Sequence, residues 1–227
     1  GLLLTYGPFL HLGNAEKEIS LALDISPRFA PAHLTLGWIL EQKEYQSPNK
    51  GHLERAIQSY ETARDLLEGT LNTQLMAAVQ LNLGNAFMQL GKIDSAFNAY
   101  LNREMMGIPF KDRHREVLFR MRFARSSISQ EAYDLAIDQS GIARRLVENK
   151  VLGKKSNHYK AKVLSIQAAA HFQAELYEDA IDLFDAGFKL YQKQENWTHA
   201  IPLLRGKALS QLYSGRVEES ETSFSTL

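Results

Sequence analysis

A small residue returns along this chain at nearly constant intervals, with a larger residue usually four positions later. The small residues are Ala15, Ala56, Ala96, Ala136, Ala180 and Ser220, at steps of 41, 40, 40, 44 and 40. The positions four later hold Ile19, Tyr60, Tyr100, Ser140, Phe184 and Phe224. Positions i and i+4 share one face of a helix, where a small residue admits a neighbouring helix. A helical unit repeated in this way predicts an array of packed helices.

A second series of small residues precedes the first at a fixed distance. It consists of Gly37, Gly84, Ala124, Ala168 and Ala208. The offset to the first series is 12 in the last four repeats (96−84, 136−124, 180−168, 220−208) and 19 in the second repeat (56−37). A constant offset predicts two antiparallel helices joined by one kind of turn, with the longer offset absorbed by the turn-forming stretch 46–52. The expected pairs are 30–43 with 52–67, 72–90 with 93–106, 113–128 with 130–148, 157–174 with 177–193 and 198–213 with 216–227, after a single helix over 15–25.

The third repeat carries the motif most fully, as Leu83, Gly84, Phe87, Gly91, Ala96 and Tyr100. This pattern resembles the tetratricopeptide repeat, although the period here is near 40 residues and that repeat typically has 34. Long-period versions are similar to those of spindle-orientation adaptors and of bacterial regulators with helical-repeat sensors. The resemblance implies an all-α, right-handed superhelical solenoid of antiparallel helix pairs, whose first helices line the concave face.

We expect residues 1–227 to form a single array of about six repeats. The expected repeats are a degenerate 1–28, then 29–69, 70–110, 111–152, 153–195 and a truncated 196–227. Gly7-Pro8 interrupts the first helix of the first repeat. The chain has no initiator Met and stops inside an apparent helix, so we expect it to be a fragment of a larger protein.

The composition of the chain disfavours several classes of function. Lys plus Arg and Asp plus Glu are 26 each, which disfavours a nucleic-acid partner, because such proteins neutralise phosphates. There is no cysteine and no apolar run of about 18 residues, so we expect a cytoplasmic protein that does not enter a membrane. The seven histidines lack ligand spacing and no catalytic motif is present. We therefore expect no enzyme activity, no catalytic residues, no metal and no cofactor.

Polar residues on the predicted first helices are the candidates for binding a partner. Asn82 and Asn85 lie three apart on one face, and an Asn side chain can bond a peptide backbone amide through both donor and acceptor. Related adaptors use Asn in this way, which is what the resemblance implies here. The alternative is that Asn85 bonds a neighbouring hairpin. One repeat later the same two positions hold Arg122 and Arg125 (82+40, 85+40), so we expect a central groove with two asparagines and two arginines.

The same register marks four more candidates: Gln89, Trp38, Lys162 and Arg205. It also passes through Phe172 and Tyr213. Trp38 could anchor a partner, but a lone Trp near an irregular end more often fills space, so packing is favoured. The arginine pair belongs to a basic cluster made of Lys111, Arg113, Arg115, Arg120, Arg122 and Arg125. This cluster either recognises carboxylate or phosphate groups or is a solvated, internally paired face.

The leading hypothesis is a protein-interaction scaffold or adaptor that binds an acidic peptide or partner helix on its concave face. The alternative is a ligand- or peptide-sensing regulatory domain of a multidomain signalling or transcription protein. An RNA-binding repeat is disfavoured by the neutral charge. The carboxylate clamp of chaperone-binding repeats is disfavoured because Trp38 and Ala169 stand where it needs polar residues. Self-association through the truncated last hairpin stays open.

Overall fold

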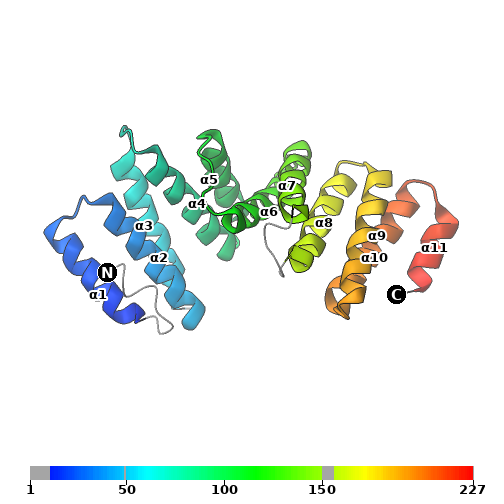
Figure 1. The fold of residues 1–227 in the computed structure, drawn as a ribbon, viewed down its shortest axis with the longest axis horizontal. Helices are drawn as coiled ribbons and strands as arrows, with labels where there is room; N and C mark the ends of the chain where they lie inside the picture. The colour runs from blue at the N-terminus through cyan, green and yellow to red at the C-terminus, as the bar shows by residue number, and fades with distance from the viewer. Residues whose placement is uncertain (1–10, 49, 150–155, 227) are drawn as a thin grey trace. The chain divides into compact units, whose positions relative to one another are not determined.

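The computed structural model describes residues 11–48, 50–149 and 156–226, and throughout those ranges the regular secondary structure is α-helical. The chain divides into two compact units, Gly1–Pro109 and Phe110–Leu227, called unit 1 and unit 2 here. Consecutive helices run back and forth within each unit (Figure 1). The prediction of an all-α fold built from paired helices is confirmed.

Unit 1 holds five helices in its described part, and each packs against the next. They are α1 (Leu12–Ile25), α2 (Ala30–Gln46), α3 (His52–Leu67), α4 (Thr73–Gln89) and α5 (Ile93–Met105). The first helices of its two complete pairs, α2 and α4, also contact each other. Unit 1 is therefore built as the repeat predicts, with first helices in one layer and second helices in another.

Unit 2 holds six helices in its described part, again each packed against the next. They are α6 (Arg113–Ser129), α7 (Tyr133–Glu148), α8 (Ser156–Gln173), α9 (Tyr177–Lys193), α10 (Trp197–Tyr213) and α11 (Val217–Ser225). The first helices contact one another, α6 with α8 and α8 with α10, whereas α7, α9 and α11 do not. The first helices therefore form the more tightly packed layer of unit 2.

The helix boundaries agree with the sequence prediction at most ends, and three differ by three residues. The first helix, expected from residue 15, begins at Leu12. The helix expected to stop at residue 43 continues to Gln46, and the connection to α3 spans 47–51, inside the predicted turn-forming stretch 46–52. The helix expected from residue 130 begins at Tyr133, because Glu131 adopts a left-handed backbone with φ 56°. The interruption predicted at Gly7 and Pro8 lies outside the described residues. The division into six repeats of a single array stays a prediction.

One kind of turn joins the two helices of each pair from α4 onward. In each turn an amide bonds back five residues to the end of the first helix, as between Lys92 N and Phe87 O at 2.9 Å. This bond and a left-handed residue define the Schellman motif, which satisfies the last carbonyls of a helix. The left-handed residues recur at one register, as Gly91, Glu131, Glu175 and Gly215. The repeated turn explains the constant offset of 12 between the two small-residue series.

Both small-residue series lie in the core, as the sequence predicts. Their members from the second helices, Ala15, Ala56, Ala96, Ala136, Ala180 and Ser220, are 0–2% exposed. In two pairs the glycine of the first helix lies against the aromatic ring of the second. A Cβ on Gly37 would meet Tyr60 at 2.4 Å, and one on Gly84 would meet Tyr100 at 2.4 Å. The small residues thus make room for buried rings and bring the paired helices close together.

Helix α1 is held on unit 1 by an ion-pair cluster around one carboxylate. Glu16 bonds Lys43 of α2, and its other oxygen accepts from Arg55 Nη2 of α3 at 2.9 Å. Burial alone would raise the pKa of Glu16, but the hydrogen bonds from Lys43 and Arg55 outweigh it and lower that pKa below its ordinary value of 4.5. The ionised form of Glu16 is therefore stabilised in the folded unit.

Replacing Glu16 with glutamine is expected to lower the free energy of unfolding by about 1 kcal/mol at pH 7. A folded pKa below the unfolded one gives stability that is present above pH 4.5 and lost as the pH falls through the folded pKa. The difference between wild type and Glu16→Gln should therefore shrink towards zero as the pH falls below 4.5 and through the folded pKa. Urea titrations monitored by circular dichroism at several pH values measure it. Asp24→Asn, an exposed carboxylate on the same helix, is the control; an equal, pH-independent loss in both variants would contradict the prediction.

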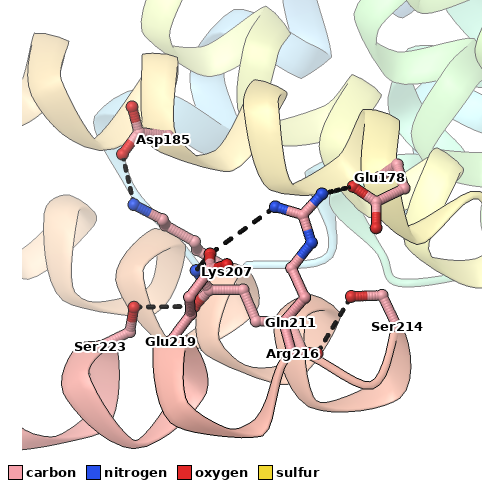
Figure 2. A network of polar contacts seen from close by, with 8 residues as sticks. All are labelled: Glu178, Asp185, Lys207, Gln211, Ser214, Arg216, Glu219 and Ser223. Atoms are coloured by element: carbon pink, nitrogen blue, oxygen red, sulfur yellow. Dashed lines mark hydrogen bonds and ion pairs between the residues drawn. The ribbon is translucent and has the colours of Figure 1, made fainter.

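Helix α11 is tied to α9 and α10 by polar contacts (Figure 2). Arg216, just before α11, pairs with Glu178 of α9 and lies 3.6 Å from Glu219 of its own helix. Gln211 of α10 donates to Glu219 Oε2 at 3.1 Å and accepts from Ser223 Oγ at 2.8 Å. These contacts fix a short helix that buries only two of its residues, both serines. These polar contacts therefore hold α11 on the other two helices.

Candidate functional site

A groove of about 610 Å³ lies in unit 2, between the first helices α6 and α8. One wall is a stripe of α6 residues spaced three or four apart, which share one face of that helix. The facing wall is a similar stripe on α8, and one residue each from α9 and α10 close the groove. The lining residues are Leu118, Met121, Arg122, Arg125 and Ile128 from α6, Lys162, Ser165, Ile166 and Ala169 from α8, and Tyr191 and His199.

Three cationic side chains converge on this groove. Arg122 and Lys162 are half-buried, whereas Arg125 is exposed. No carboxylate lines the groove, and within the described ranges neither Arg125 nor Lys162 forms an ion pair. The positive charge of Arg125 and Lys162, without a counter-charge in a partly enclosed cavity, favours an anionic ligand. Because most of the other lining side chains are apolar, the groove also suits an apolar group carried by the same ligand.

The end of the groove near α10 is shaped by two rings that lie tilted against each other. His199 lies against Tyr191 with ring centroids 5.2 Å apart, and its Nδ1 donates to Asn196 Oδ1 at 2.9 Å. Burial raises the pKa of the Tyr191 phenol above its ordinary value of 10.0. Tyr191 is therefore neutral at physiological pH, and it gives the groove a largely buried aromatic end.

The structure brings together three of the eight predicted site residues, namely Arg122, Arg125 and Lys162. Arg205 is exposed on α10 and does not line this groove. Asn82, Asn85, Gln89 and Trp38 belong to unit 1. The expected groove that combines two asparagines with two arginines therefore stays a prediction.

The candidates in unit 1 make internal contacts. Asn85 Oδ1 accepts from the Tyr100 hydroxyl at 2.9 Å, which ties α4 to α5 within one helix pair. The alternative in which Asn85 bonds a neighbouring hairpin stays a prediction. Gln89 Nε2 donates to Glu41 at 2.6 Å and ties α4 to α2. Asn82 is half-buried on the same helix. Part of the role of Asn85 and Gln89 is therefore to join helices.

Trp38 packs beside the irregular first repeat. It lies against a cluster that contains Leu12, Ala15 and Ile39, between α1 and α2. The packing interpretation favoured for this residue is consistent with that position. The predicted role of Trp38 as a partner anchor gains no support from its surroundings.

The remaining basic residues before and within α6 divide into paired and exposed ones. Glu116 accepts from Arg113 at 2.7 Å and lies 3.7 Å from Arg120, which also donates to Gln139 at 2.6 Å. Lys111 and Arg115 are exposed. The basic cluster is thus internally paired in part.

Sequence reasoning missed most of the apolar lining of the groove. Leu118, Met121 and Ile128 lie three or four residues from the predicted arginines, as Ile166 does from Lys162. That spacing could have identified them as lining residues, because residues one helical turn apart share a face of the helix. Tyr191 and His199 enter from other helices, and no local pattern connects them to α6.

The chain was also compared with known proteins. No protein-family model and no curated protein matches it. Solved structures do match: RapI in its apo form has a TM-score of 0.66 at 12% identity, over 99% of this chain and 60% of that one. Tetratricopeptide-like repeats of a kinesin light chain from Podospora anserina have a TM-score of 0.62 at 12% identity, over 85% of this chain and 91% of that one.

A signal transduction ATPase from Pyrococcus horikoshii with a tetratricopeptide repeat sensor has a TM-score of 0.64 at 14% identity, over 95% of this chain and 33% of that one. Identities this low establish the fold and no more. The fold is tetratricopeptide-like. The predicted resemblance is therefore confirmed at the level of architecture, and this chain spans about a third of the ATPase.

Two further observations concern the described part of this tetratricopeptide-like chain. None of its helices is long and apolar enough to span a membrane. No cluster of three or more His, Asp or Glu side chains is arranged to hold a metal ion there.

Proposed function

We propose that this chain is a protein-interaction module that binds an acidic segment of a partner protein in the groove between α6 and α8. The observation that carries the proposal is the lining of that groove, where Arg122, Arg125 and Lys162 meet apolar side chains without any carboxylate. The tetratricopeptide-like fold supports a scaffold role, because such repeats present extended grooves on a rigid array. We propose no catalytic step.

The chemistry of the lining suggests how a segment would be held. An arginine guanidinium forms paired hydrogen bonds to a carboxylate, whereas Lys162 supplies a compact charge. Leu118, Met121 and Ile166 would receive an apolar side chain next to the acidic one. Affinity would come mainly from the apolar contact, and the cations would set specificity and speed the encounter.

A sensing role remains the second candidate. The Pyrococcus horikoshii ATPase with the same fold has its repeats as a sensor, and such a role here would use the same groove. The two functions differ in what binding does to the unit. A sensor changes the packing between helices on binding, which hydrogen exchange in α9 and α10 would detect, whereas a scaffold leaves that exchange unchanged.

A peptide-display selection tests the proposed function. The wild-type protein is expected to select twelve-residue peptides that combine an acidic residue with a neighbouring apolar one. Arg125→Glu together with Lys162→Glu is expected to weaken binding of a selected peptide at least tenfold, since repulsion replaces attraction. The wild-type affinity should fall as salt is raised, because exposed charges are screened. Isothermal titration calorimetry measures both effects.

The matched control is Arg145→Glu, because Arg145 is an exposed arginine on α7 outside the groove. It should leave the affinity for the selected peptide unchanged. Thermal unfolding confirms that the variants remain folded. Selection of peptides without acidic residues, or an equal effect of the control, would show that the proposed function is wrong.

A further inference from the structure

Three aromatic rings meet at the turn end of unit 2, where α8 and α10 finish and α9 begins. Phe172 lies edge-on to Tyr177 at 5.7 Å and to Tyr213 at 5.8 Å, measured between ring centroids. Tyr177 and Tyr213 are stacked, with centroids 5.5 Å apart and an interplanar angle of 19°. We call these three residues the aromatic triad. Three separate helix ends supply it, so it is a tertiary feature.

The triad is unevenly covered. Phe172 and Tyr177 are half-buried, which fits a role in packing the turn, but Tyr213 is 62% exposed. The stack on Tyr177 uses one face of the Tyr213 ring, so packing leaves most of this ring to solvent. An exposed aromatic face held in place by two other rings is an available platform for a flat group.

The surroundings of the triad are acidic. Desolvation raises the pKa of the Tyr177 phenol, and the nearby carboxylate of Glu175 and Tyr213 raise it further. Glu175 is exposed and, within the described ranges, forms no ion pair. The neighbouring Glu178 is already paired with Arg216 (Figure 2). The exposed Tyr213 ring is stacked on Tyr177, and the uncompensated carboxylate of Glu175 lies near Tyr177; together they complement a cation.

The triad continues the cationic groove along α8. Ala169, which lines the groove, and Phe172 lie three residues apart and share a face of the helix. Lys162 and Phe172 are ten residues apart, which corresponds to about 15 Å along a helix. An extended peptide covers that distance in roughly four to five residues. One short segment can therefore reach both places.

We propose that the aromatic triad binds an arginine side chain of the same partner segment, four to five residues from the acidic residue held in the groove. This inference rests on the proposed function and adds the second half of the recognition motif. The planar guanidinium would stack on the exposed face of Tyr213, and Glu175 would pair with its charge. Unit 2 would then recognise a peptide segment that has an acidic residue at one end and a basic residue at the other.

The experiment extends the peptide selection to two targets, the wild-type protein and Tyr213→Ala. The wild type is expected to enrich arginine at a fixed spacing of four to five residues from the acidic position. Tyr213→Ala should keep the acidic preference and lose the arginine one. In calorimetry, changing the arginine of a selected peptide to glutamine should weaken binding to the wild type roughly three- to tenfold and leave binding to Tyr213→Ala unchanged.

Two further variants sharpen the test. Glu175→Gln should reduce the arginine preference in part and make it less sensitive to salt. Tyr45→Ala removes a tyrosine of matching exposure, 63%, from α2 in unit 1, and it should change nothing. Far-ultraviolet circular dichroism checks the fold of each variant.

The outcomes separate this inference from the proposed function. Acidic peptides selected without arginine enrichment, or an arginine effect that persists in Tyr213→Ala, would overturn the role of the triad and leave the groove intact. Selection of no acidic peptides would overturn both. Arginine enrichment that disappears only in Tyr213→Ala and weakens in Glu175→Gln would establish the triad as the arginine site.

Discussion

Replacing Gly84 with alanine is expected to lower the free energy of unfolding of unit 1 by about 2–3 kcal/mol. The added Cβ would meet Tyr100 Cε1 at 2.4 Å and Cδ1 at 2.5 Å, closer than carbon atoms can approach. The ring cannot move aside, since Tyr100 is 0% exposed and its hydroxyl bonds Asn85 on the same helix as the glycine. Helices α4 and α5 would have to separate, so contacts around the ring would be lost.

Urea denaturation monitored by circular dichroism measures the loss, and hydrogen exchange assigns it to α4 and α5. Gly13→Ala is the control, because Gly13 is a helical glycine with no atom within 4 Å of the added Cβ. It should stabilise α1 by up to about 1 kcal/mol, as alanine favours a helix over glycine. Tyr100→Leu in the Gly84→Ala background should recover part of the loss. An unchanged stability in Gly84→Ala would show that the two helices can separate at little cost.

Replacing Phe184 with alanine is expected to destabilise unit 2 by about 3–5 kcal/mol. Phe184 is 7% exposed within a core cluster that includes Ala168 and Leu203. Its ring also fills the space over Gly206 of α10, where a Cβ would lie 2.6 Å from it. The alanine variant would leave a cavity between α9 and α10 that neither helix backbone can fill.

Phe224→Ala provides the comparison, since Phe224 occupies the same position of the repeat but is 39% exposed. Its loss should cost about 1 kcal/mol or less, because little burial is removed. Thermal and chemical unfolding of both variants measure the difference. Equal losses in Phe184→Ala and Phe224→Ala would mean that repeat position, and not burial, determines what the aromatic residue contributes.

Sequence reasoning predicted the helices well because the information is local and repeated. The series from Ala15 to Ser220 marks each second helix, and every member is buried. Gly84 and Tyr100 were identified as a small residue and the aromatic beside it, and they are in contact. Boundaries failed where backbone conformation overrode the pattern, as at Glu131 with its left-handed φ of 56°.

The candidate site could be predicted only in part. Arg122, Arg125 and Lys162 lie at the expected register and line the groove. Asn85 and Gln89 share that register, yet each already bonds another helix, Asn85 to Tyr100 and Gln89 to Glu41. The helical register predicts which face of its helix a side chain lies on. It does not predict which residue of the neighbouring helix that side chain meets.

The sequence by itself determined the fold class, the pairing of helices and the positions of the small residues, because these depend on spacing within about forty residues. Only the tertiary structure decided which polar residues are engaged and where cavities open. The groove needs Tyr191 and His199 from two further helices, and the aromatic triad needs the ends of three. The helix pattern that placed Arg122 and Arg125 on one face therefore had to be completed by packing before a binding site could be recognised.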